Sequence, residues 1–164
     1  MNIEMKGINK SFGTNQVLKN AAFELKDGEI HALMGENGAG KSTLMKILTG
    51  VYTKDSCSIF GDGQEGSYRN PEEAEKAGIV FIYQELNVLY DLTVEENLFM
   101  GKELTRGAGI CDKKAMRAKA QQVMDRMGVH IPVDRTMNQL SVGQQQMVEI
   151  CKALMVDAKV LIMD

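Results

Sequence analysis

The sequence predicts an α/β fold with a largely parallel sheet, and three observations point to it. Short apolar runs of strand length recur along the chain, the last of them at residues 79–83 and 160–163. Segments with helical spacing of apolar residues separate these runs, and several of them begin with a capping residue. Glycine is frequent, at 16 residues, and many of these glycines fall where an element is expected to end. Alternating strands and helices are typical of a sheet that is covered by helices.

Length, composition and charge indicate a globular domain and exclude several classes of protein. The 164 residues, 44% hydrophobic and 25% charged, fit one domain or part of a larger one. The net charge of -3, from 19 basic and 22 acidic residues, gives no basic excess for binding nucleic acid. No apolar run approaches the roughly 18 residues of a membrane span, and the N-terminus lacks a secretory signal pattern. The three cysteines are widely separated, which is typical of reduced thiols in a cytosolic protein.

We expect strands in the first part of the chain, followed by a helix. Ile3, Met5 and Ile8 are spaced loosely like one face of a strand. Residues 44–49 have the apolar spacing of a helix, and Gly50 is expected to end it. The other strand candidates, each next to a turn that contains Asp-Gly or another glycine signal, are residues 21–25, 29–34 and 56–60.

Capping signals place the helices in the rest of the chain. Asn70 is a capping residue, Pro71 suits the first helical position, and Glu73 completes the capping arrangement. Gly78 is expected to end this helix. Two similar capping pairs are Thr93 with Glu96 and Ser141 with Gln144. The expected elements that follow are a strand at 79–83, helices at 94–100, at 113–127 and from the Ser141 cap to about residue 155, and a strand at 160–163.

The strongest functional signal is a glycine-rich loop between an expected strand and an expected helix. Its glycines let the backbone turn sharply and point N–H groups at phosphate oxygens, and the helix presents its positive dipole end to the same anion. We expect Lys41 to reach the β- and γ-phosphates, the Ser42 hydroxyl to bind Mg²⁺, and Thr43 to add a further donor. The residues that match the phosphate-loop pattern G-x-x-x-x-G-K-[ST] are Gly35, Glu36, Asn37, Gly38, Ala39, Gly40, Lys41 and Ser42.

Asp164 is the second half of this expected site. It follows the apolar run at 160–163, so it would leave the carboxyl end of a buried strand, where ligands bind in open α/β sheets. A carboxylate there can hold Mg²⁺ through water opposite Ser42. An aspartate that ends a strand is more often a turn residue, and the upstream phosphate loop favours the metal role.

Two further segments carry weaker functional signals. In residues 140–146, Ser141 caps a helix and Gly143 leaves the backbone exposed, so the segment is either a second anion site or an ordinary capped helix. Gln84 follows the apolar strand at 79–83. Its amide could lie beside a metal or an attacking water at the end of that strand, or Gln84 could be an ordinary loop residue.

Taken together, these segments resemble the ATP-binding cassette (ABC) proteins over the whole chain. Two details are similar to the monosaccharide-importer ATPases of ribose, galactose and xylose type: the Gln-Glu-Leu-Asn run at 84–87, and Val142 where the commoner signature has a second glycine. The sequence looks like the N-terminal part of the first of two cassettes on one polypeptide. The motifs in the order and spacing of the family are residues 35–42, Gln84, residues 140–146 and the strand that ends at Asp164.

The resemblance implies a P-loop NTPase (ABC ATPase) fold, truncated at its C-terminus. Residues 1–164 would be an incomplete nucleotide-binding domain. About 1–83 and 156–164 would form the core with an N-terminal antiparallel β subdomain, and about 84–155 the helical subdomain with the signature helix. In the family a later strand lies between the phosphate-loop strand and the strand that ends at Asp164. We therefore expect this chain alone to be marginally stable or prone to aggregation.

The resemblance also implies cofactors, residue roles and partners. ATP and Mg²⁺ would be the cofactors, Phe12 would stack on adenine, and Gln84 would sense Mg²⁺ and the attacking water. The partners would be membrane permease subunits of a sugar importer at the cytoplasmic face of the cell membrane, a second cassette, fused or separate, and indirectly a sugar-binding protein, but no nucleic acid. The residues that would close over ATP on the opposite cassette are Ser141, Gly143 and Gln144.

The leading hypothesis is an energy-coupling ATPase that binds MgATP and, in the complete protein, hydrolyses it to drive carbohydrate uptake, with Lys41, Gln84 and Asp164 at its catalytic site. In the family a catalytic glutamate directly follows the aspartate that matches Asp164, and this sequence ends there. A nucleotide-binding fragment without hydrolysis is therefore one alternative. Another is a soluble ABC protein of DNA repair or the ribosome, against which the near-neutral charge counts. A kinase would leave residues 140–146 unexplained.

Overall fold

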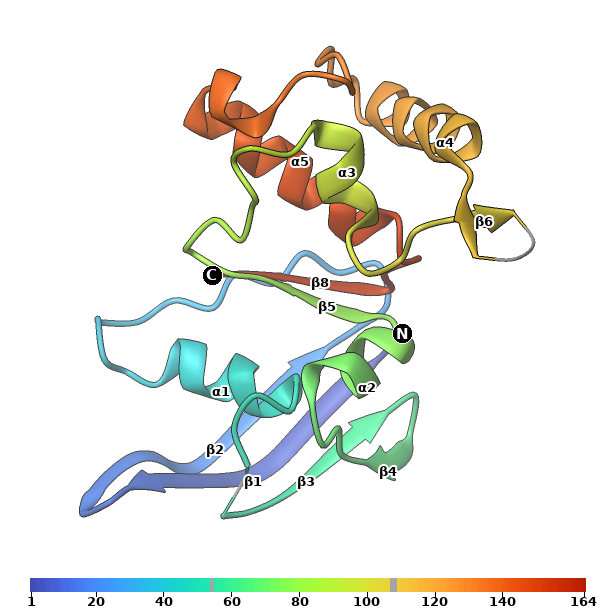
Figure 1. Cartoon of the computed structure of the whole chain (residues 1–164). Coiled ribbons are helices and arrows are strands. Elements are labelled where there is room, and N and C mark those ends of the chain that lie inside the picture. The colour runs from blue at the N-terminus through green and yellow to red at the C-terminus, as the bar shows by residue number, and fades with distance from the viewer. Residues whose placement is uncertain (54, 107–108) are drawn as a thin grey trace. The chain divides into compact units, whose positions relative to one another are not determined.

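The computed structural model describes residues 1–53, 55–106 and 109–164, which form two compact units (Figure 1). The first unit comprises residues 1–81, 159–162 and 164, and the second comprises residues 82–158 and 163. Each unit has its own apolar core. The core of the first is Ile3, Met5, Ile8, Leu18, Leu44, Ile47, Leu48, Ile59, Ala74, Ile79, Val160 and Ile162. The core of the second is Val88, Val94, Leu98, Phe99, Met116, Ala120, Met124, Val129, Ile131, Val133, Met137, Leu140, Val148 and Cys151.

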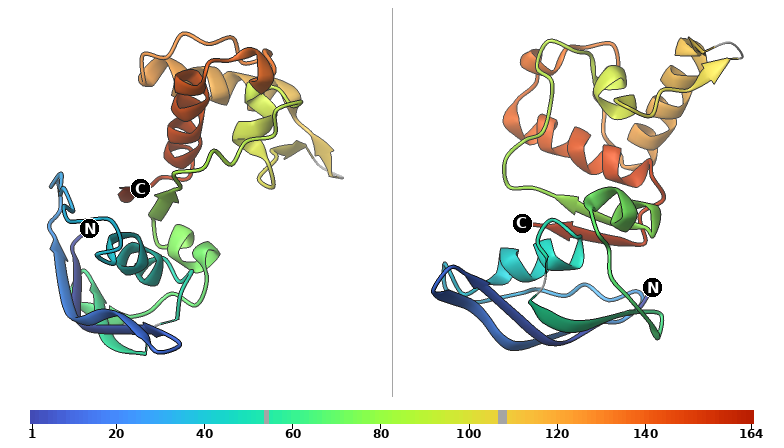
Figure 2. Two further views of the ribbon diagram at one scale, coloured as in Figure 1. Left: turned by 90° about the vertical axis from the view of Figure 1, so that its left-hand side faces the viewer. Right: turned by 60° about the horizontal axis from the view of Figure 1, so that its bottom comes forward.

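The first unit is built on a four-stranded antiparallel sheet with the strand order β2-β1-β3-β4, which Figure 2 shows from two sides. Two-residue connections at 13–14 and 62–63 force the strands that they join into antiparallel hairpins. In the second connection Asp62 has φ 48° and Gly63 has φ 78°, and two positive φ angles are the requirement of a type I′ hairpin turn. The strands are β1 (Ile3–Phe12), β2 (Asn15–Leu25), β3 (Ser56–Gly61) and β4 (Gln64–Gly66).

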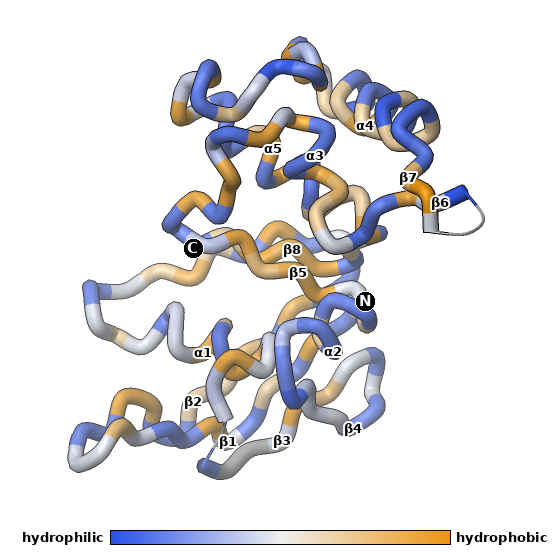
Figure 3. Tube along the Cα trace, in the orientation of Figure 1, coloured by the Kyte–Doolittle hydropathy of each residue, from blue (hydrophilic) through white to orange (hydrophobic). Residues whose placement is uncertain are grey.

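Two helices and a pair of strands accompany this sheet. They are α1 (Lys41–Leu48), α2 (Pro71–Lys76), β5 (Ile79–Ile82) and β8 (Val160–Met163), with β5 hydrogen-bonded to β8. Asn70 caps α2 as predicted, because its side chain accepts the Glu73 N–H at 2.9 Å. The chain enters β8 beside the end of α2, where Lys159 and Val160 both donate to the Gly78 carbonyl. Both β5 and β8 are orange in Figure 3, as expected of apolar strands.

The second unit packs three helices around its core. The predicted capping boxes of Thr93 with Glu96 and of Ser141 with Gln144 are both present. Asp112 caps a further helix by accepting the Ala115 N–H at 3.0 Å, which was not predicted. The elements are α3 (Val94–Phe99), α4 (Lys113–Arg126), α5 (Val142–Leu154), a 3₁₀ turn η1 (Met137–Gln139) and a hairpin of β6 (Thr105–Arg106) and β7 (Ile110–Cys111). None of the helices within the described ranges has the length and apolar character needed to cross a bilayer.

A buried amide organises the loop that leads into α3. Asn97 is 2% exposed, and its Oδ1 accepts the Leu89 N–H at 2.8 Å. Its Nδ2 donates to the carbonyls of Leu89 at 3.0 Å, Thr93 at 2.9 Å and Leu92 at 3.3 Å. The Leu92 carbonyl also accepts the Met137 N–H at 3.0 Å. The loop is therefore tied on one side to α3 and on the other to η1, which directly precedes the residues 140–146 singled out in the sequence.

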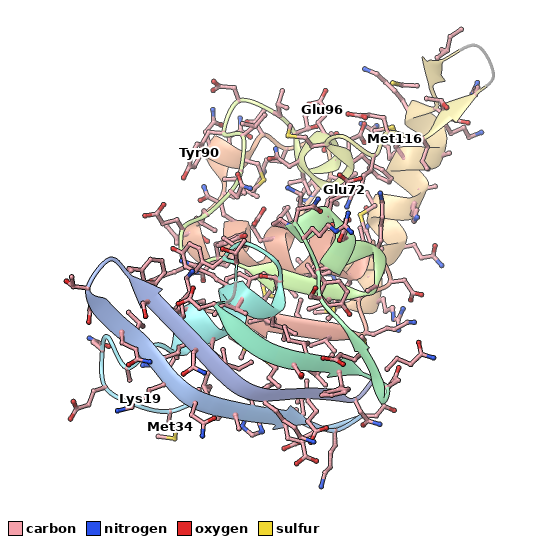
Figure 4. The ribbon with its side chains drawn as sticks, turned by 90° about the horizontal axis from the view of Figure 1, so that it is seen from below. Lys19, Met34, Glu72, Tyr90, Glu96 and Met116 are labelled. Atoms are coloured by element: carbon pink, nitrogen blue, oxygen red, sulfur yellow. The ribbon has the colours of Figure 1, made fainter. Side chains whose placement is uncertain are left out.

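Two predictions about strands are wrong, namely the largely parallel sheet and the strand at residues 29–34. Within the described residues, six of the eight strands belong to antiparallel sheets, because the short hairpin connections do not allow the crossover that a parallel pair needs. Residues 29–34 form no strand, since none of the sheets in the described ranges provides them with a pairing partner. Ile30 is fully exposed and Met34 is 89% exposed, and Met34 projects from its loop in Figure 4. The antiparallel β subdomain that the family resemblance implies is confirmed.

Candidate functional site

The N-terminus of α1 is free of side-chain caps. The helix begins at Lys41 and its N-cap is Gly40, which makes no side-chain capping bond, and the first turn contains no acidic residue. The first backbone bond of the helix runs from the Leu44 N–H to the Gly40 carbonyl at 2.8 Å. The preceding N–H groups therefore point out of the helix end, where the helix dipole favours an anion.

Gly40 is required at this position for two reasons. Its φ of 86° lies in the left-handed region. A Cβ added there would lie 2.6 Å from Leu18 Cδ2 and 3.2 Å from the Val17 carbonyl oxygen, so the loop backbone presses directly on β2. The sheet thus fixes the position of the loop from which α1 starts.

Lys41 folds back over the loop. Its ammonium donates to the Gly35 carbonyl at 2.8 Å and to the Glu36 carbonyl at 2.9 Å. The Glu36 carbonyl also accepts the Ala39 N–H at 3.1 Å, which closes the turn between them. The lysine charge is therefore held next to the open helix end, where both would attract the same phosphate group.

The structure brings together two of the three residues expected at the metal, Ser42 and Asp164. The Ser42 hydroxyl donates to Asp164 Oδ1 at 2.7 Å, although the two residues are 122 positions apart. A hydroxyl and a carboxylate are oxygen ligands of the kind that Mg²⁺ prefers, and Mg²⁺ usually keeps several waters and binds phosphates rather than sitting in an all-protein cage. Among the described residues there is no cluster of three or more His, Cys, Asp or Glu side chains that would form such a cage. The residues present therefore fit Mg²⁺ carried by a phosphate ligand.

Phe12 lies at the end of β1, in the same unit as the loop, and 43% of it is exposed. The Tyr52 ring meets it edge-to-face, with centroids 5.2 Å apart and an interplanar angle of 75°. The Lys10 ammonium lies 5.3 Å from the Phe12 centroid and forms an ion pair with Asp55 at 3.2 Å. This cluster was not predicted from the sequence, because Tyr52 and Asp55 are about forty residues from Phe12 and match no motif.

The other predicted site residues lie in the second unit. Gln84 is exposed in the loop after β5. Ser141 and Gln144 bind each other at the start of α5, where the Ser141 N–H donates to Gln144 Oε1 at 3.0 Å. Gly143 has open space where a Cβ would be. This helix end is therefore closed by its capping box and exposed beyond it.

One carboxyl group of the second unit has a perturbed pKa. Burial raises the pKa of Glu149 on α5, against the opposing effects of the Lys152 ammonium and of the Asn87 backbone N–H, which donates to this carboxylate. Glu149 thus links α5 to the segment that follows Gln84. The sequence did not single out this residue.

A phosphate loop that leads into an uncapped helix, with a hydroxyl and a carboxylate side by side at the helix start, defines a nucleotide-binding domain of the P-loop class. Comparison with known families gives the particular one. The family model described as ABC transporter matches residues 18–164, and the chain belongs to this family. Family membership implies nucleotide binding.

Relatives of the chain include ribose import ATP-binding proteins RbsA. The chain is 59% identical to the RbsA protein of Bacillus cereus and 53% identical to the RbsA protein of Bacillus subtilis. In each case the match covers the whole of this chain and 33% of the relative. The chain therefore spans about a third of the length of the relatives that it matches.

Solved structures of ATP-binding cassettes of ABC transporters share the fold. An ADP conformation of such a cassette matches 98% of this chain and 67% of its own, with a TM-score of 0.84 and 27% identity. A nucleotide-free cassette matches 100% of this chain and 69% of its own, with a TM-score of 0.83 and 29% identity. These matches confirm the predicted ABC ATPase fold.

Proposed function

We propose that the chain is the ATP-binding, energy-coupling part of an ABC sugar importer. The hydrogen bond between Ser42 and Asp164 is the observation that supports the nucleotide assignment, because a hydroxyl and a carboxylate that could both bind Mg²⁺ lie together at the start of the phosphate-loop helix. The relatives that import ribose favour a monosaccharide as the transported cargo. Hydrolysis of bound ATP would supply the energy for uptake in the complete protein.

The residues of the loop would divide the work of binding MgATP. The open N–H groups of α1 bind the phosphate oxygens, and Lys41 moves from the loop carbonyls to the outer phosphates. Ser42 and Asp164 hold Mg²⁺, which neutralises charge on the phosphates when bound. Phe12 stacks on the adenine ring. Each of these groups is positioned by an element of the first unit.

The second unit would serve coupling. Gln84 would report the state of the nucleotide to a membrane permease, and the exposed start of α5, with Ser141, Gly143 and Gln144, would close over ATP bound to a second cassette. Leu89 and Tyr90 are about half exposed, and Tyr90 lies at the surface in Figure 4, which supports docking of this unit on an apolar partner surface. The chain would then act at the cytoplasmic face of the membrane, with a sugar-binding protein as an indirect partner.

Calorimetric titration of the chain with ATP, with and without Mg²⁺, tests the nucleotide assignment. We expect Lys41→Ala to weaken binding of MgATP at least tenfold, since a charge-assisted contact to phosphate is worth about 1.5–3 kcal/mol. Ser42→Ala should remove most of the gain in affinity that Mg²⁺ provides. The matched control is Lys19→Ala, because Lys19 is an exposed lysine on β2 (Figure 4). Equal affinities of the Lys41 and Lys19 variants would contradict the proposal.

The coupling assignment needs a separate test. Pull-down with a sugar permease should retain the chain, and pull-down with ribosomes should not. Retention by ribosomes alone would favour a soluble ABC protein. Release of phosphate, measured in parallel with binding, distinguishes an ATPase from a protein that only binds the nucleotide.

A further inference from the structure

The Phe12 ring is held by residues that come from two different segments. Tyr52 contacts it edge-to-face at 5.2 Å between centroids, and the Lys10 ammonium lies 5.3 Å from its centroid. An exposed aromatic side chain at a strand end is normally free to change rotamer. Here an aromatic pair and a cation both favour one orientation of the ring.

The supporting residues are themselves fixed. Asp55 accepts the Ser11 N–H at 2.7 Å and forms the ion pair with Lys10, which is only 9% exposed. The Asp55 N–H in turn donates to the Asn9 carbonyl at 3.2 Å. Because the Ser11 N–H and the Lys10 ammonium both stabilise the carboxylate, the pKa of Asp55 is lowered. These bonds fix the end of β1 immediately before Phe12.

Tyr52 also connects the ring to the phosphate-loop helix. The N–H groups of Val51 and Tyr52 donate to the Lys46 carbonyl at 2.8 and 3.1 Å, and the Lys46 ammonium lies 5.7 Å from the Tyr52 centroid. Lys46 belongs to the last turn of α1, and α1 is eight residues, about 12 Å, long. One helix therefore carries the phosphate loop at its first residue and Tyr52 at its other end.

We propose that Tyr52, together with the ion pair of Lys10 and Asp55, holds Phe12 as a preformed stacking platform for the nucleotide base. Tyr52 is then a positioning residue that acts on the base-dependent part of the affinity and leaves the phosphate-dependent part unchanged. The proposal rests on the proposed role of Phe12 in binding adenine. It adds that the orientation of the ring is set before the nucleotide arrives, which lowers the entropic cost of binding.

The test compares two probes, MgATP and magnesium tripolyphosphate, by calorimetry on the full chain. Tyr52→Leu should weaken MgATP between about twofold and tenfold, the range expected for an aromatic pair, and leave tripolyphosphate unchanged. Phe12→Ala should weaken MgATP more, between about fivefold and a hundredfold. Tyr52→Phe keeps the edge contact and should bind both probes like the unmodified chain. The matched control is Phe60→Leu on β3, which removes another aromatic ring that a lysine ammonium contacts, with Lys6 at 5.5 Å from its centroid.

The double variant Phe12→Ala with Tyr52→Leu separates positioning from a direct role. If Tyr52 acts through the Phe12 ring, the double variant binds MgATP no more weakly than Phe12→Ala alone. Additive losses, equal losses for both probes, or unchanged MgATP affinity in Tyr52→Leu would each overturn the proposal. If Phe12→Ala leaves MgATP affinity unchanged, the adenine role of Phe12 fails together with the platform, while the Lys41 variant still reports on the phosphate site. Binding of tripolyphosphate shows in each variant that the loop is folded.

Discussion

Replacing the buried amide of Asn97 should loosen the loop in front of α3. In Asn97→Leu, which is similar in shape, the N–H of Leu89 loses the acceptor that Asn97 provides. The three carbonyls that accept from the Asn97 amide are less affected, because each also accepts a backbone N–H: that of Leu89 from Leu92, that of Leu92 from Met137 and that of Thr93 from Asn97. An unsatisfied backbone group in a buried position costs about 1–3 kcal/mol, and Leu89 is only partly buried. Because one backbone group, the Leu89 N–H, is left without its acceptor, we expect a loss of about 1–2 kcal/mol in the free energy of unfolding.

Urea unfolding measures the global effect, and amide hydrogen exchange measures the local one. The Leu89 amide should exchange faster in the variant than in the unmodified chain, since its acceptor is the Asn97 side chain. Asn138→Ala is the control, because Asn138 is exposed and its side-chain bonds lie at the surface, so it should cost less than 1 kcal/mol. A change below 0.5 kcal/mol for Asn97→Leu, about the size of an ordinary surface substitution, with unchanged protection of Leu89, would refute the reasoning.

Three further predictions concern single positions. Gly40→Ala should destabilise the first unit by about 2–4 kcal/mol and abolish binding of MgATP, because it combines a strained φ with a contact of 2.6 Å to Leu18. Gly38→Ala has φ 84° but open space around the added Cβ, so it should cost only the backbone strain of about 1–2 kcal/mol. Equal urea midpoints of the two variants would contradict this prediction. The hydrogen bond from Arg106 is the main reason that the pKa of Asp112 is lowered to about 2. The stability that the Asp112 charge provides is therefore present above its usual pKa of 3.8 and lost as the pH falls through about 2. The difference in unfolding free energy between the unmodified chain and Asp112→Asn should therefore be constant above pH 4 and shrink toward pH 2. Burial raises the pKa of Glu149. The free energy of unfolding that the protonated Glu149 carboxyl provides is therefore present below its usual pKa of 4.5 and lost as the pH rises through the raised value. Glu149→Gln should raise the urea midpoint at pH 7 and not at pH 4, and a gain of equal size at both would show that charge burial is not the cause.

The sequence predicted best those features whose cause lies within a few residues. The caps at Asn70, Thr93 and Ser141 are present as predicted, because each satisfies an N–H group only three positions ahead. The phosphate loop is also local, and its glycines carry the positive φ angles that its pattern implies at Gly38 and Gly40. The cap at Asp112 was missed although its signal, an aspartate before a helical segment, was present in the sequence.

The proximity of Ser42 and Asp164 is an exception, because both were expected at one metal site although they are 122 positions apart; their direct hydrogen bond was not predicted. Asp164 follows the end of a strand and Ser42 stands at the start of a helix, and both positions are visible in the sequence without knowing which strands pair. The roles of Ser42 and Asp164 in metal binding stay predictions, as do those of Gln84 and the signature residues. The cluster of Tyr52, Lys10 and Asp55 shows the opposite case, since ring contacts between distant segments leave no periodic signal in either of them.

Residues 29–34 show why strands are harder to predict than helices. A helix satisfies its backbone within its own segment, so α1 and α5 need only their own sequence and an apolar face to pack against. A strand satisfies its backbone only through a second segment, and its apolar pattern indicates burial without saying which backbone pairs with it. Ile30, Leu33 and Met34 are exposed although the run that contains them has the composition of a buried strand. An exposed apolar run of this kind favours association with another chain, so this segment supports the prediction, made from the family resemblance, that the isolated chain is marginally stable or prone to aggregation.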